Sequence, residues 1–130
     1  MHKGFLITAF IFGALAVAFG AFGAHALKEL VSQRVIITFE TAVRYQFYHV
    51  FALIVSAILY KEFTNKWMRA AGWLFITGLV LFCISLYMLC YVQATVQPGF
   101  KWLGPVTPVG GFAFIAGWVC MLVGVVRGRR

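Results

Sequence analysis

Five polar side chains lie in or beside the long apolar segments of this chain and are its main candidates for chemistry: His25, Gln46, His49, Tyr87 and Thr107. Imidazole, amide, phenol and hydroxyl groups all make hydrogen bonds. Such groups are costly to place in hydrocarbon, and where a membrane protein keeps them they often mark a site. We therefore treat these five residues as a candidate ligand-binding site.

The two histidines raise the question of a metal or a haem. Imidazole is a good ligand for zinc, copper and iron, and His25 and His49 would supply two such ligands. His2 lies at the opposite end of the first apolar segment, and Glu40 is the only acid nearby that might join them. We expect hydrogen bonds rather than ligation, and so no metal and no cofactor. The cysteines form no CxxC or other metal-binding spacing and indicate small packing residues: Cys83, Cys90 and Cys120.

Sequence motifs of catalysis are absent. The chain has no nucleophile placed with a base, no Walker loop, no HExxH and no dinucleotide fingerprint. We expect a protein that is not an enzyme. Thr107 and Pro108 have a simpler interpretation, because threonine caps helices and proline suits the first helical position.

Four apolar stretches must position these residues. Hydrophobic residues make up 63% of the 130 residues and charged residues only 11%, and roughly 20 helical residues cross a bilayer. Continuous apolar runs indicate helices, because membrane-spanning strands alternate in polarity. The sequence predicts an all-α fold, an integral membrane four-helix bundle in a single transmembrane domain, 1–130. The predicted spans are 4–24, 42–60, 70–92 and 109–126.

A short amphipathic segment is expected between the first two spans. From Leu27 to Ala42 the apolar residues recur at helical spacing, and most of the charged residues lie elsewhere. Two arrangements fit this pattern. The segment either lies at the membrane interface or extends directly into the second span.

The positive charges favour one topology. Cytoplasmic loops collect Lys and Arg, and the net charge of +8 is spread over the helix ends rather than gathered in a nucleic-acid-binding patch. We expect membrane lipids as partners and no nucleic acid. The prediction is a multi-pass protein of the cell (inner) membrane with cytoplasmic N- and C-termini. The cytoplasmic side then holds Lys3, Lys61, Lys66, Arg69, Arg127, Arg129 and Arg130, against Lys28, Arg34, Arg44 and Lys101 outside.

This antiparallel arrangement has a consequence for the candidate site. On the predicted spans, the five polar residues all fall toward the non-cytoplasmic ends of their helices. They would then form one polar cluster at the outer leaflet.

Small residues form a row along the fourth span. Gly110, Gly117 and Gly124 recur every seven residues, with Ala113 and Cys120 between them. Small side chains let membrane helices approach closely. The row therefore serves either internal packing or the interface of a homo-oligomer.

Four ordered motifs resemble one known family. They are Gly20-Ala21-Phe22-Gly23-Ala24-His25-Ala26-Leu27-Lys28, Thr41-Ala42 with Tyr45-Gln46 and His49, Leu86-Tyr87, and Leu103-Gly104 with Thr107-Pro108-Val109-Gly110-Gly111 and Gly117-Trp118. Together they resemble the family of domain of unknown function 423, which comprises YgdD-like small inner-membrane proteins and the eukaryotic transmembrane protein 256. The resemblance implies a four-helix membrane protein and no catalytic residue. Where bacterial members show Phe-Ser-Gly-Ser-Leu-Tyr, this chain departs with Phe82-Cys83-Ile84-Ser85-Leu86-Tyr87.

From these observations we expect a structural or ligand-binding membrane protein whose polar cluster receives a lipid or another small amphiphile. One alternative is an oligomeric permease or channel for small solutes. The other is a redox accessory protein that carries haem or quinone.

Overall fold

The computed structural model describes residues 1–95 and 103–128, and they form four long helical rods. The first rod runs through α1 (Lys3–Phe22), a π-helical turn (Gly23–Leu27) and α2 (Lys28–Leu30). The second is α3 (Gln33–Leu59). The third runs through α4 (Lys66–Gly78), a π-helical segment (Leu79–Ile84) and α5 (Ser85–Thr95), and the fourth is α6 (Leu103–Arg127).

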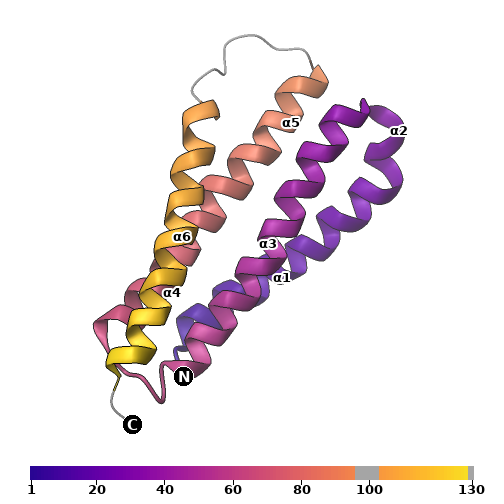
Figure 1. Ribbon diagram of the computed structural model, residues 1–130. Coiled ribbons are helices and arrows are strands. Elements are labelled where there is room, and N and C mark those ends of the chain that lie inside the picture. Colours follow the sequence, from indigo (N-terminus) through magenta and orange to yellow (C-terminus); the bar gives the residue numbers. More distant parts are fainter. Residues whose placement is uncertain (96–102, 129–130) are drawn as a thin grey trace.

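Each rod is long and apolar enough to cross a membrane. The predicted all-α, four-helix membrane fold is therefore confirmed. The rods alternate in direction, so that the start of α1 and the end of α6 lie at the same end of the bundle (Figure 1). The chain residues Lys101, Arg129 and Arg130, which the topology prediction uses, lie outside the described residues.

Two helical hairpins make up the bundle. α1 packs along α3, and α4 packs along α6, while α3 also contacts α4 and α5. The two hairpins pack together at the end that carries the termini, and α6 leans away from α5 toward the end that carries α2 (Figure 1). The main core lies where the hairpins meet, around Phe5, Leu53, Met68 and Phe75, each at most 1% exposed.

The second membrane helix begins at Gln33 rather than near residue 42, so the segment between the first two spans is an extension of that helix. The charged residues Arg34, Glu40 and Arg44 lower the local hydropathy, so the predicted span excludes most of this segment. The helix nevertheless continues through all three. Its apolar side explains why, since Val35 and Phe39 are buried against neighbouring helices. Only the bend at Val31 and Ser32 interrupts the helical chain here.

The fourth helix also begins earlier than predicted, at Leu103, and the predicted cap at Thr107 is wrong. Thr107 and Pro108 lie inside α6. Proline in the first turn of a helix loses no hydrogen bond, and Pro105 occupies that position. The proline that suits the helix start is therefore Pro105 rather than Pro108.

The row of glycines on α6 packs within the chain. A Cβ atom on Gly110 would collide with the backbone of Phe82, and one on Gly117 would lie 2.7 Å from the ring of Phe75. On Gly124 it would meet the backbone nitrogen of Met68 at 3.2 Å. Internal packing against α4 and the π-helical segment thus accounts for the small residues on this face of α6.

Candidate functional site

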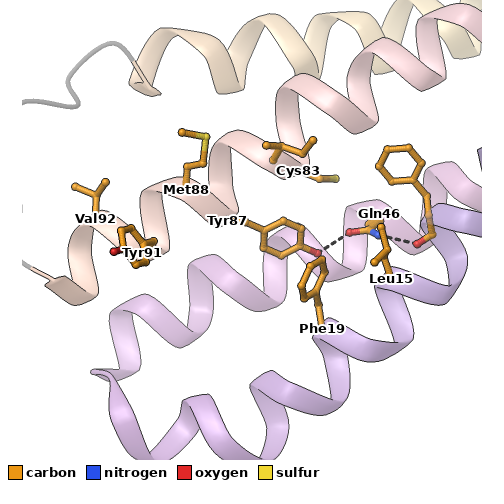
Figure 2. A pocket seen from close by; sticks show the side chains of 10 residues that line it. Leu15, Phe19, Gln46, Cys83, Tyr87, Met88, Tyr91 and Val92 are labelled. Atoms are coloured by element: carbon orange, nitrogen blue, oxygen red, sulfur yellow. Dashed lines mark hydrogen bonds between the residues drawn. The ribbon is translucent and has the colours of Figure 1, made fainter.

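Gln46 joins three helices at the middle of α3. Its side chain is 1% exposed. Nε2 donates a hydrogen bond of 2.7 Å to the carbonyl oxygen of Phe12 on α1. Because that carbonyl can only accept, the amide oxygen faces the other way and accepts a 2.6 Å bond from the hydroxyl of Tyr87 on α5 (Figure 2). Both polar ends of the glutamine are therefore satisfied inside the bundle.

This network forms the floor of a cavity between α1 and α5. The cavity has a volume of about 560 Å³, and Gln46 is its only lining residue from α3. Its rim is open, since Leu15 is 41% and Tyr91 63% exposed. Figure 2 shows side chains from both walls around this space. The lining residues are Phe12, Leu15, Phe19, Gln46, Cys83, Ile84, Tyr87, Met88, Tyr91 and Val92.

An aromatic cluster borders the cavity. The ring of Tyr87 lies 4.8 Å from that of Phe19 and 5.2 Å from that of Phe39, between ring centres. A smaller cavity of about 240 Å³ shares Tyr87 and Tyr91 with the first. The two cavities therefore lie along the same face of α5.

The wall formed by the π-helical segment and α5 is held against α3 by weak thiol hydrogen bonds. Cys83 donates to the carbonyl oxygen of Ala42 at 3.6 Å, and Cys90 donates to that of Val35 at 3.7 Å. Both thiols, seven residues apart, lie on the face of the rod toward α3. Cys83 and Ile84, the two departures from the family pattern, both line the cavity directly.

His49 is held by two hydrogen bonds that fix its tautomer. Nδ1 lies 2.8 Å from the carbonyl oxygen of Tyr45, which can only accept. Nε2 accepts a 3.1 Å bond from the indole N–H of Trp118. These partners assign a neutral imidazole with its proton on Nδ1. The ring also stacks on Phe114, with centres 3.5 Å apart. The lone pair that would bind a metal is thus occupied.

His25 and Thr107 lie away from Gln46. His25 is exposed, and its Nδ1 lies 2.9 Å from the carbonyl oxygen of Ala21 in the same helix. Thr107 is half-buried, with its hydroxyl 2.7 Å from that of Ser85. Within the described residues, no group of three or more metal-ligating side chains forms. Neither residue lines the α1–α5 cavity.

The structure does not bring the five predicted residues into one pocket. Gln46 and Tyr87 share the α1–α5 cavity, while His49 lines a second groove between α3 and α6. The rotation of α3 explains the difference, because Gln46 faces Phe12 on α1 whereas His49 faces Trp118 on α6. Tyr45, Tyr48 and Trp118 also line the second groove. Sequence reasoning did not select them, although Trp118 lies unusually deep in its span for a tryptophan.

Comparisons with known proteins agree with this architecture. The UPF0382 membrane protein YwdK of Bacillus subtilis is 38% identical over 126 residues, which cover 96% of this chain and 98% of the relative. The UPF0382 membrane protein SH2409 of Staphylococcus haemolyticus is 36% identical over 125 residues, covering 96% and 97%. The UPF0382 inner membrane protein YgdD of Escherichia coli K12 is 37% identical over 125 residues, covering 96% and 91%.

No solved structure matches the chain. Residues 19–111 match the family described as Protein of unknown function (DUF423), and this range includes Gln46, His49 and Tyr87. With this match and relatives that align over nearly the whole length, the chain belongs to the DUF423 family of membrane proteins.

Proposed function

We propose that this membrane protein binds an apolar chain of a lipid or of a similar amphiphile in the α1–α5 cavity, and that it is a binding or structural protein rather than an enzyme. The supporting observation is an aromatic and aliphatic cavity with one buried polar pair at its floor. Protein ligand pockets commonly measure roughly 300–1,000 Å³ and contain few polar groups. The volume of about 560 Å³ falls within that range.

The shape of the cavity favours entry from the bilayer. Its floor at Gln46 is 1% exposed, whereas Leu15 and Tyr91 at the rim are 41% and 63% exposed. These exposed residues belong to rods long enough to span the membrane. An apolar chain could therefore enter sideways from the surrounding lipid without first crossing water.

The polar floor limits the chemistry of the ligand. The amide oxygen of Gln46 is taken by Tyr87, but the phenol oxygen of Tyr87 still has acceptor capacity. A ligand hydroxyl at this depth would gain a hydrogen bond there. Among the described residues, none that lines the cavity is charged, and a charge in such surroundings would be costly. We therefore propose a neutral ligand segment.

Filling the cavity tests this proposal. We expect Leu15→Trp to reduce the lipid that copurifies with the protein by severalfold, because the larger side chain occupies the space between α1 and α5. Native mass spectrometry of protein released from detergent micelles would measure the bound lipid. Ile11→Trp is the matched control, since Ile11 is 56% exposed on the same helix and does not line the cavity. Equal lipid occupancy in the two variants would contradict the proposal.

We further propose that the end carrying both termini faces the cytoplasm. Cations gather there beside aromatic side chains, as expected at a membrane interface. Lys66 and Arg127 each lie 5.6 Å from the ring centre of Trp67, and Arg69 donates a 2.8 Å hydrogen bond to the hydroxyl of Tyr60. The excess of Lys and Arg at this end supports the orientation.

Cysteine labelling would check the orientation. Ser32 and Thr64 are exposed and lie at opposite ends of α3. With a membrane-impermeant maleimide on intact spheroplasts, we expect Ser32→Cys to be labelled and Thr64→Cys to be labelled only after permeabilisation. Wild-type protein gives the background from the three native cysteines. The reverse pattern would place the termini outside.

A further inference from the structure

A second groove, between α3 and α6, has features that the lipid-chain proposal does not use. Its volume is about 570 Å³, and His49 and Trp118 meet across it. It is lined from α3 by Tyr45 and Tyr48 and closed by the ring of Phe82. None of the described residues that line it is charged. It is a separate space from the α1–α5 cavity, with no lining residue in common.

The tyrosines of this groove lie near the middle of α3, just after the exposed Arg44. α3 has 27 residues, so at about 1.5 Å per residue it is roughly 40 Å long and overshoots a hydrocarbon core of about 30 Å. Tyr45 lies one residue before Gln46, the midpoint of α3. Tyrosines that anchor a protein at the interface lie near the ends of spans, so anchoring does not explain this pair.

The hydroxyls of Tyr45 and Tyr48 differ from the buried polar groups of the same helix. Gln46, His49 and Ser56 on the same helix all have hydrogen-bond partners. Neither tyrosine hydroxyl bonds to any of the described residues, and the two side chains are 38% and 54% exposed. Moving a hydroxyl from water into hydrocarbon without a hydrogen-bond partner costs on the order of several kcal/mol. These two donors therefore call for an acceptor from outside the chain.

The surroundings specify the shape of that acceptor. Tyr45 stacks on Phe82, with ring centres 4.9 Å apart and planes 24° from parallel. The rings of Tyr45 and Tyr48 are 6.0 Å apart, so their hydroxyls can act on one molecule. Acyl-chain hydrocarbon offers no acceptor, and lipid ester groups lie nearer the interface than the middle of a span. A flat ring with carbonyl oxygens meets both requirements, since it stacks on aromatic faces and accepts from phenols.

We infer that the α3–α6 groove binds the ring of a quinone-class molecule, with the hydroxyls of Tyr45 and Tyr48 donating to its carbonyl oxygens. His49 and Trp118 offer the ligand only their ring surfaces. The indole N–H of Trp118 is bound to Nε2 of His49, and Nδ1 of His49 is bound to the backbone carbonyl oxygen of Tyr45. The apolar tail of the ligand extends into lipid through the open side of the groove. The inference concerns binding and does not depend on the lipid-chain proposal for the other cavity.

The decisive variant removes the two hydroxyls and keeps the rings. Decyl-ubiquinone is the probe, titrated into protein in phosphatidylcholine nanodiscs, with the saturable quenching of tryptophan fluorescence as the readout. We expect Tyr45→Phe/Tyr48→Phe to raise the Kd by about tenfold or more, as the loss of two hydrogen bonds implies. Tyr91→Phe, which removes an exposed hydroxyl beside the other cavity, should leave the Kd unchanged.

A second probe isolates the carbonyl groups. Decylbenzene has a similar tail and a flat ring but no acceptor, so wild type and the double variant should bind it equally. Because neither hydroxyl has a partner within the described residues, the double variant should unfold at the same temperature as wild type. An unchanged Kd for decyl-ubiquinone in the folded double variant, or no saturable quenching in wild type, would overturn the inference. Lipid retention in the Leu15→Trp experiment is measured separately, so either proposal can fail alone.

Discussion

Gln46→Leu is expected to destabilise the protein by about 1–3 kcal/mol, because it removes two interhelical hydrogen bonds at once. Leucine is close to glutamine in volume, so the loss is mainly polar rather than a cavity effect. The change leaves the hydroxyl of Tyr87 without its acceptor inside the bundle, and it releases the contact with the Phe12 carbonyl on α1. Reversible unfolding in mixed detergent and dodecyl sulfate micelles would measure the free energy.

A double-mutant cycle separates the Tyr87 bond from the rest of the effect. We expect Gln46→Leu and Tyr87→Phe to be coupled by about 0.6–1.7 kcal/mol, the range typical of hydrogen bonds between membrane helices. Tyr91→Phe supplies the control, because Tyr91 lies one turn further along α5 and is 63% exposed. If Gln46→Leu lowered the free energy of unfolding no more than Tyr91→Phe does, the hydrogen bonds of Gln46 would not be what joins the three helices.

Gly110→Ala is expected to cost about 1–3 kcal/mol, although alanine is the better helix former. The added methyl group would collide with the backbone of Phe82 in the π-helical segment. Backbone cannot move aside as a side chain can, so α6 must shift away from α4 and the segment that follows it. Thermal unfolding of both forms in the same detergent would give the difference in stability.

The neighbouring glycine makes a sharp comparison. A Cβ atom on Gly111 would meet the ring of Phe82 at 3.9 Å, which is ordinary van der Waals contact. Gly111→Ala should therefore be neutral or stabilise the helix by up to about 1 kcal/mol. Equal effects of the two substitutions would mean that the close approach at Gly110 does not occur in the membrane.

The fold was predictable from sequence because the physical signal for membrane helices is strong. Long stretches without charge leave the helix as the only arrangement that satisfies the backbone in lipid, and all four stretches become rods. Helix ends were harder. Arg34, Glu40 and Arg44 end the apolar stretch in sequence but lie along a helix whose apolar side continues to Val35. A hydropathy profile averages the polarity of neighbouring residues in the sequence, and it does not distinguish the buried side of a helix from its exposed side.

The candidate site was only partly predictable for the same reason. Its polar residues were found by their cost in hydrocarbon, and every one of Gln46, His49 and Tyr87 does make a specific hydrogen bond. Which of them share a cavity depends on the depth and rotation of each helix. An error in the start of α3 therefore moved Gln46 and His49 to the outer leaflet. The sequence equally left open which neighbour the Gly110 row would face, since small residues suit any close contact.

The π-helical segment Leu79–Ile84 has a consequence for how such chains can diverge. A π-helical turn accommodates one residue more than an α-helical turn does. If the same residues formed a regular α-helix instead, α5 would be rotated relative to α4 by about 100°. Tyr87 would then turn away from Gln46, and both thiols would leave the carbonyls of α3. A gap of a single residue at this place would, by contrast, let a regular α-helix keep α5 in its present register, so a relative could lose the π-helical turn and still direct Tyr87 toward Gln46.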